Sequence, residues 1–257
     1  GAKLRTFKHN DVTDLARVLG REALGESCSS NRKSKIENRK WILVAVESLY
    51  SMDGDVAPLR EMYALTHAAG ALLLVDEAHA TGVLGPQGRG VLAELFDGPL
   101  PPDVLAMGTL SKALGSQGGF LCAGKLVTDV IVHAGRAFLF STGLAPAAAG
   151  AAREALRSAA ADEPRRQDLL RRAENLRAAL RANGWKVLGG PGPILPIMVG
   201  DEAAAVRLSE KLLDQGVWVP AVRFPTVKQG QARLRVSLSA AHNEKDVRRL
   251  VDALGKA

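Results

Sequence analysis

Three short apolar runs, separated by helix-like stretches, constrain the fold of this chain more than any other feature. The runs cover residues 42–47, 71–76 and 103–108, and a helix-like stretch at 58–69 lies between the first two. Apolar runs of this length that alternate with helices are typical of buried parallel strands. We therefore predict an α/β fold with a largely parallel sheet, covered by helices on both faces.

The rest of the chain divides into two parts. In the first part we expect a further strand at 118–123 and helices at 11–24, 125–134 and 146–161. Pro164 ends that last helix and opens another at 165–183, because proline is tolerated only in a first helical turn. Beyond it we expect strands at 185–188, 194–199 and 232–238 and helices at 202–215 and 243–254. The pattern predicts a large domain over 1–161 and a small C-terminal α+β domain over 162–257.

Lys112 and Asp76 are the residues that most directly indicate a chemistry. Asp76 closes the second apolar run, and Lys112 follows the third in a glycine-rich turn. In open α/β sheets, ligands bind at such strand ends. A lysine amine forms a Schiff base with the aldehyde of pyridoxal 5′-phosphate, and an aspartate partners its pyridinium nitrogen. The pair predicts that cofactor, although a lone lysine in such a turn would be read as a surface residue.

Two segments resemble motifs of nucleotide-binding enzymes. Residues 73–79 (LLVDEAH) match the acidic box of helicases, and residues 119–126 (GFLCAGKL) nearly match a phosphate-binding P-loop. The match fails because Leu126 stands where a P-loop needs a hydroxyl for magnesium, and because the loop follows the acidic box instead of preceding it. We therefore do not expect nucleotide hydrolysis.

Composition excludes several other classes. Hydrophobic residues make up 47% and charged residues 24%, as in ordinary globular proteins. The formal net charge is +7, but acids are interleaved with the arginines, which indicates solvated helix faces and not a nucleic-acid interface. No apolar run approaches the ~20 residues that span a bilayer, and no signal-peptide pattern is present, so we expect a cytoplasmic protein without membrane partners.

The cysteines and histidines indicate neither disulfides nor a metal. Cys122 lies in a strand-like run and is expected to serve packing, whereas Cys28 lies in a Ser-rich loop and is expected to be exposed. Apart from His79, the histidines do not have the spacing of metal ligands, so we expect no metal. They are His9, His67, His133 and His242.

A series of motifs in order carries a family resemblance. After the strand ends come ESLYSMDGDVAPL at 47–59, GVLGPQGRG at 82–90, MGTLSKALGSQGG at 107–119, FSTGLAP at 140–146, VRFPTV at 222–227 and ARLRVSLSAAH at 232–242. From about His9 onward the chain resembles the α-oxoamine synthase family of pyridoxal-phosphate enzymes. The resemblance implies fold type I (the aspartate-aminotransferase type) and a homodimer. It implies the decarboxylative condensation of L-alanine with a pimeloyl thioester carried on coenzyme A or acyl carrier protein. Glycine C-acetyltransferase and 5-aminolevulinate synthase activities are the alternatives.

The resemblance also assigns roles to individual residues. Besides Lys112 and Asp76, it places His79 at the phenolic oxygen of the cofactor, and it places Ser51 and Glu47 beside the cofactor. Two of these residues have a plainer interpretation. His79 could be a structural histidine, and Ser51 could be a cap or turn residue.

Three further assignments concern the phosphate and the substrate. The resemblance makes Thr109 and, across a dimer interface, Thr142 phosphate ligands, although Thr142 could be only a helix cap. It makes Arg235 the ligand of the amino-acid carboxylate, a task that suits a planar guanidinium. Arg233 lies two residues away on the same expected strand face, so the residues alone do not choose between the two arginines.

The match departs from the family at the N-terminus. Family members carry a further N-terminal region that supplies a stacking histidine, a phosphate loop and part of the acyl-chain pocket. None of these precedes Gly1, so the resemblance implies a partial enzyme whose large domain exposes apolar faces. We expect such a chain to bind the cofactor weakly, and a fragment that only binds a partner subunit is the alternative from another class.

Overall fold

The computed structural model describes residues 2–24 and 41–255, which form two compact units. The first, here called the sheet unit, takes its residues from Gly1–Ser48, Ala57–Thr81 and Arg89–Ala155. The second, here called the C-terminal unit, takes them from Leu49–Val56, Gly82–Gly88 and Leu156–Ala257. Two short segments from the first half of the chain, Leu49–Val56 and Gly82–Gly88, thus belong to the second unit, so one boundary in the sequence does not separate the two units. The domain division at 161/162 stays a prediction.

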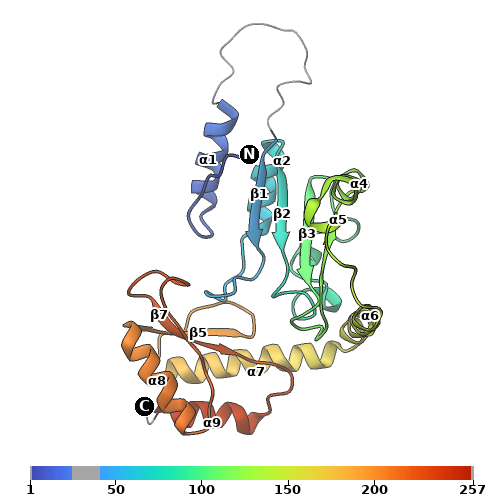
Figure 1. Cartoon of the computed structure of the whole chain (residues 1–257). Coiled ribbons are helices and arrows are strands. Elements are labelled where there is room, and N and C mark those ends of the chain that lie inside the picture. Colours follow the sequence, from blue (N-terminus) through green and yellow to red (C-terminus); the bar gives the residue numbers. More distant parts are fainter. Residues whose placement is uncertain (1, 25–40, 256–257) are drawn as a thin grey trace, which may run out of the picture. The chain divides into compact units, whose positions relative to one another are not determined.

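The sheet unit is built on a four-stranded sheet with the order β1-β2-β3-β4 (Figure 1). Strands β1 (Leu43–Glu47), β2 (Leu72–Asp76) and β3 (Val104–Thr109) are parallel, and β4 (Gly119–Cys122) pairs antiparallel with β3. The prediction of a largely parallel α/β sheet is therefore confirmed.

The register of this sheet decides which side chains share a face. Glu47 pairs with Asp76, and Asp76 pairs with Met107. Because paired residues in neighbouring strands project to the same side, these three side chains share one face. The opposite face is buried and is built by Val44, Val46, Leu73, Val75 and Val104.

Helices cover the buried face of the sheet unit. The helix α1 (Val12–Leu24) begins after Asp11, whose Oδ1 accepts the amide N–H of Asp14 at 2.8 Å. It contacts α2 (Leu59–Ala68), and α2 contacts β2 and the short α3 (Leu92–Leu95). On the other face, Leu43 is 55% and Met107 37% exposed. The prediction that helices cover both faces is therefore wrong at these positions of the described chain.

The second half of the sheet unit exposes much apolar surface. The helices α4 (Lys125–Ala134) and α5 (Arg136–Leu139) contain no buried residue, and Leu126, Val130, Phe138 and Phe140 are exposed. In α6 (Pro146–Ala161), Ala152 is buried. The expected exposure of apolar faces is found, and the expected packing role of Cys122 is wrong because this residue is exposed. Cys28 lies outside the described residues, and among the helices that are described none could cross a membrane.

The C-terminal unit has a small antiparallel sheet with the order β5-β7-β6. The strands are β5 (Ile194–Gly200), β6 (Ala221–Val222) and β7 (Ala232–Ser237), and the helices are α7 (Glu163–Ala182), α8 (Glu202–Asp214) and α9 (Glu244–Gly255); a single 3₁₀ turn, η1, covers Pro86–Gly88. Both α7 and α8 contact β5. The core between them includes Leu176, Leu180, Leu195, Ile197, Leu212 and Leu234.

The strand predicted at 185–188 is wrong. Only an isolated bridge, Val187 to Ile197, is formed there. The facing β5 strand contains Pro196, which has no N–H to donate to a ladder, and Gly189 ends the segment with a positive φ of 96°.

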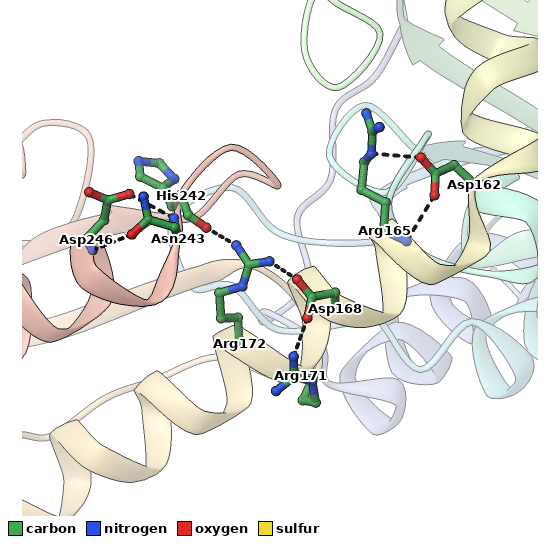
Figure 2. Close-up of polar contacts among 8 residues, drawn as sticks. All are labelled: Asp162, Arg165, Asp168, Arg171, Arg172, His242, Asn243 and Asp246. Atoms are coloured by element: carbon green, nitrogen blue, oxygen red, sulfur yellow. Dashed lines mark hydrogen bonds and ion pairs between the residues drawn. The ribbon is translucent and has the colours of Figure 1, made fainter.

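Figure 2 shows polar contacts at the start of α7 and between the middle of α7 and the turn that precedes α9. Asp162 caps α7 by accepting the amide N–H of Arg165 at 3.2 Å, which confirms the helix break predicted before Pro164. Arg172 contacts the Asp168 carboxylate and donates to the backbone oxygen of His242, in the turn that precedes α9. These contacts fix where α9 begins relative to α7.

The α8 helix offers a matched test of the C-terminal core. Leu212 is fully buried, whereas its neighbour Leu213 is 54% exposed. We expect Leu212→Ala to lower the free energy of unfolding by about 2–5 kcal/mol, because it leaves a cavity in the core. Leu213→Ala should change it by no more than ~0.5 kcal/mol. Urea denaturation of both variants measures the difference, and equal losses would contradict the packing described above.

Candidate functional site

The carboxyl ends of the parallel strands carry a row of candidate side chains on the open face of the sheet. Glu47 ends β1, Asp76 ends β2 and Thr109 ends β3, two residues beyond Met107 and therefore on the same face. All three are partly buried. The structure thus brings together three residues that the sequence could place only at separate strand ends.

Asp76 is held in place by its own backbone. The amide N–H of Ala78 donates to Asp76 Oδ1 at 2.8 Å, and the backbone oxygen of Asp76 accepts the amide N–H of Ser48 at 2.9 Å. Among the described residues, Oδ2 of Asp76 takes part in no recorded hydrogen bond. One carboxylate oxygen is therefore fixed, and the other can accept a proton donor on the open face.

Lys112 lies in a tight turn that begins where β3 ends. The turn is closed by the amide N–H of Leu110, which donates to the backbone oxygen of Gly118 at 2.9 Å. Thr109 Oγ1 donates to the same oxygen at 3.1 Å. Gly115 and Gly118 adopt positive φ angles of 58° and 109°, which other residues rarely take. The lysine side chain is exposed and enters no recorded ion pair within the described chain.

The Lys112 turn is attached to the segment that carries Thr142. Ser116 Oγ donates to the backbone oxygen of Ala148 in α6 at 2.7 Å. The side chain of Leu144 lies 3.3 Å from the place that a Cβ on Gly118 would occupy. Thr142 itself is exposed, between α5 and α6. The structure thus packs the segment that contains Leu144 and Ala148 against the lysine turn, and the role of Thr142 as a phosphate ligand stays a prediction.

His79 lies in the turn after β2 and is partly buried. That turn is shaped by the backbone oxygen of Glu77, which accepts the amide N–H groups of Ala80 and Thr81 at 2.9 and 2.8 Å. The position agrees with a residue beside the strand end, and the proposed contact of His79 with the cofactor stays a prediction.

Glu77, which the sequence reasoning did not select, forms a buried network beneath the site. It is only 3% exposed, and its carboxylate accepts Ser48 Oγ at 2.7 Å, the amide N–H of Val91 at 3.0 Å and that of Leu92 at 2.7 Å. Burial raises the pKa of Glu77, and these three hydrogen bonds oppose the rise. Strand alternation was the available signal, because one of two adjacent acids at a strand end must face the covered side.

In the C-terminal unit, the structure distinguishes the two arginines of β7. Arg233 is 1% exposed, and its Nη1 donates to the Asp53 carboxylate at 2.7 Å and to the backbone oxygen of Met52 at 3.0 Å. Arg235 is only partly buried; its Nε donates to the backbone oxygen of Ser51 at 2.6 Å and its Nη1 to Ser237 Oγ at 2.9 Å. Burial lowers the pKa of the Arg235 guanidinium. Arg233 is thus engaged by the protein itself, and Arg235 lies beside Ser51 with Nη2 in no recorded contact of the described residues.

Comparison with known proteins places this geometry in a family. Residues 1–254 match the family model described as aminotransferase class I and II. The chain belongs to this family. Among curated members of the family, it is similar to the 8-amino-7-oxononanoate synthases of Dechloromonas aromatica (39% identical over 254 residues) and Marinobacter nauticus (40% over 257). These alignments cover 99% and 100% of this chain but 62% and 61% of those proteins, so the chain spans under two thirds of their length.

Solved structures of the family agree with the fold. A serine palmitoyltransferase variant from S. paucimobilis, with a bound PLP-myriocin aldimine, superposes with a TM-score of 0.84 at 31% identity, covering 97% of this chain and 59% of that one. The Sphingomonas wittichii serine palmitoyltransferase gives 0.84 at 32%, with the same coverage. The 8-amino-7-oxononanoate synthase of Francisella tularensis gives 0.78 at 24%, covering 99% and 68%, and supports the fold alone. Fold type I is therefore confirmed.

The raised pKa of Glu77 predicts a pH dependence of stability. A carboxyl group whose pKa is higher in the folded than in the unfolded protein holds its proton more tightly when folded. Its contribution to the free energy of unfolding is therefore complete below its ordinary pKa of 4.5 and is lost as the pH rises through the raised value. Urea denaturation at several pH values should show a steeper decline for the wild type than for Glu77→Gln. Parallel profiles would contradict the assignment.

Proposed function

We propose that this chain carries the pyridoxal-phosphate site of an α-oxoamine synthase that condenses L-alanine with a pimeloyl thioester and releases carbon dioxide. The single observation that supports it most is the row of Glu47, Asp76 and Thr109 on the open sheet face, with Lys112 in the turn that β3 enters. The identity of about 40% to enzymes named 8-amino-7-oxononanoate synthase supports the same activity.

The residues at this edge fit the cofactor. Lys112 offers an exposed amine for the aldehyde, and Asp76 has one oxygen fixed by Ala78 and the other able to face a protonated ring nitrogen. In this proposal Thr109 and, across the dimer interface, Thr142 bind the phosphate, while His79, Glu47 and Ser51 line the ring. Hydroxyl groups can donate hydrogen bonds to a phosphate. Glycine-rich turns let the backbone approach it closely.

The proposal then assigns a role to each side chain. The cofactor supplies an electron sink for the bond-making and decarboxylation steps. Lys112 would hold the cofactor through its amine, and, once freed by the incoming amino acid, this amine would take the proton from the amino-acid Cα. Asp76, as a carboxylate, keeps the ring nitrogen protonated, and Arg235 binds the substrate carboxylate through its planar guanidinium. The choice of Arg235 over Arg233 is supported by the contacts that already occupy Arg233.

The partners and the place of action follow from the same proposal. The substrates are an amino acid and an acyl thioester on coenzyme A or acyl carrier protein, and the working form is a homodimer in the cytoplasm. The exposed apolar surface of α4 and α5 supports an association of this kind. We propose no nucleic-acid, membrane or metal partner.

The alternatives separate by substrate. The likeness to serine palmitoyltransferases, at 31% and 32% identity, favours serine as a second candidate amino acid. Glycine is the substrate of the other two sister activities. We expect L-alanine to change the visible absorbance of the bound cofactor at a lower concentration than glycine or L-serine does. Titration with the three amino acids measures this, and a preference for serine or glycine would replace the proposed substrate while keeping the cofactor site.

Covalent attachment of the cofactor tests the proposal itself. Borohydride reduction with excess pyridoxal phosphate, followed by peptide mapping, should place the label on Lys112, and Lys112→Ala should remove it. Lys125→Ala is the matched control, because Lys125 is also exposed in the sheet unit but is paired with Asp129 at 2.6 Å. Reduction captures even a weakly bound cofactor. A label on another lysine, or none at all, would favour the fragment that only binds a partner.

A further inference from the structure

The two adjacent acids at the end of β2 have opposite surroundings. Asp76 shares the open face of the sheet with Glu47 and Met107, whereas Glu77 is buried and contacts Ser48 and the start of α3. The proposed chemistry uses Asp76 and leaves Glu77 without a role. A buried carboxylate one residue from a functional one requires a physical reason, because desolvation of a charge is costly.

Glu77 connects three segments of the sheet unit that are distant in sequence. Its Oε2 accepts Ser48 Oγ, which follows β1, and the amide N–H of Val91; its Oε1 accepts the amide N–H of Leu92. Its own amide N–H donates to the backbone oxygen of Met107 in β3 at 2.7 Å. The strand ends of β1, β2 and β3 are thereby held through this one residue.

The surroundings leave no room for a different arrangement. At Gly90, which has a φ of 97°, an added Cβ would lie 2.6 Å from the Glu77 carboxylate. The Glu77 carboxylate has three partners, the Ser48 hydroxyl and the amide N–H groups of Val91 and Leu92, and all three are donors. An ionised carboxylate accepts from all of them and offers no proton of its own. A glutamine has one oxygen and an NH₂ group, so at least one N–H of Val91 or Leu92 would face another donor.

We propose that Glu77 is a positioning residue that holds the Asp76 carboxylate in the direction in which it meets the ring nitrogen of the cofactor; this rests on the proposed function. The peptide units on both sides of Glu77 are fixed by its contacts. Ser48 N–H and Oγ contact the backbone oxygen of Asp76 on one side, and Ala78 N–H donates to Asp76 Oδ1 on the other. Turning the Glu77 side chain out of its network would move Ala78, and the fixed oxygen of Asp76 with it.

The Ala78 amide reports this geometry without any cofactor. Its N–H is bound to Asp76 Oδ1 at 2.8 Å, so its exchange with solvent measures how well Asp76 is held. In Glu77→Gln we expect the Ala78 amide to exchange at least ~10-fold faster, the equivalent of losing one or two hydrogen bonds. Glu61→Gln is the matched control: it removes an exposed carboxylate of α2 that is not among the groups acting on Glu77, and it should leave the exchange unchanged.

A second readout separates positioning from mere stability. In the chain loaded with pyridoxal phosphate, the pH midpoint of the visible absorbance depends on the charge that faces the ring nitrogen. We expect Glu77→Gln to shift this midpoint in the same direction as Asp76→Asn, and Glu61→Gln to leave it in place. Ser48→Ala keeps the carboxylate and removes one of its donors, so it should give an intermediate effect even if Glu77→Gln folds poorly.

Two results would overturn the inference. Wild-type exchange at Ala78 in both Glu77→Gln and Ser48→Ala would show that Glu77 does not hold Asp76. Faster exchange with an unchanged absorbance midpoint would make Glu77 a structural residue only. Failure of the proposed function is a different outcome, because it appears as an unlabelled Lys112 in the wild-type chain, and the Ala78 exchange would then still decide whether Glu77 holds the aspartate.

Discussion

The parallel register of β1, β2 and β3 is the constraint on which the candidate site depends. It sets Glu47 beside Asp76 and Asp76 beside Met107, so that acids from distant parts of the sequence meet at one edge. A shift of one residue in β2 would exchange the two faces, moving Asp76 into the core and Glu77 onto the open side. The apolar residues Leu73 and Val75 prevent that shift, because it would move two fully buried side chains toward solvent.

The same alternation divides the work between two neighbouring carboxylates. On the covered side, hydrogen bonds from Ser48, Val91 and Leu92 offset part of the cost of burying the Glu77 carboxylate. On the open side, the Asp76 carboxylate accepts the amide N–H of Ala78. An apolar residue in place of Glu77 would avoid the desolvation cost, so its presence is better explained by the geometry that it imposes than by stability alone.

In the C-terminal unit, two arginines of β7 also differ in their contacts. Arg233 uses its guanidinium to hold the segment that contains Met52 and Asp53, and Arg235 stands beside Ser51 on the same strand face. The chain spans 62% and 61% of the length of relatives from its own family. In this part alone, the structure contains the groups that the proposed function uses: the Lys112 amine, the Asp76 carboxylate, the hydroxyl groups of Thr109 and Thr142 and the Arg235 guanidinium.

The sequence by itself determined most of the helices and strands and selected the residues of the proposed site. The apolar runs at 42–47, 71–76 and 103–108 fixed β1, β2 and β3 within a residue, because buried strands are short and continuous. The glycine-rich turn marked Lys112, and the motifs marked the family. Only the tertiary structure decided what depends on neighbours distant in sequence: the open sheet face at Leu43 and Met107, the single bridge at Val187 and the different uses of Arg233 and Arg235. The Glu77 network belongs to the same group, since its donors lie 14 to 29 residues away along the chain and no local pattern encodes their approach.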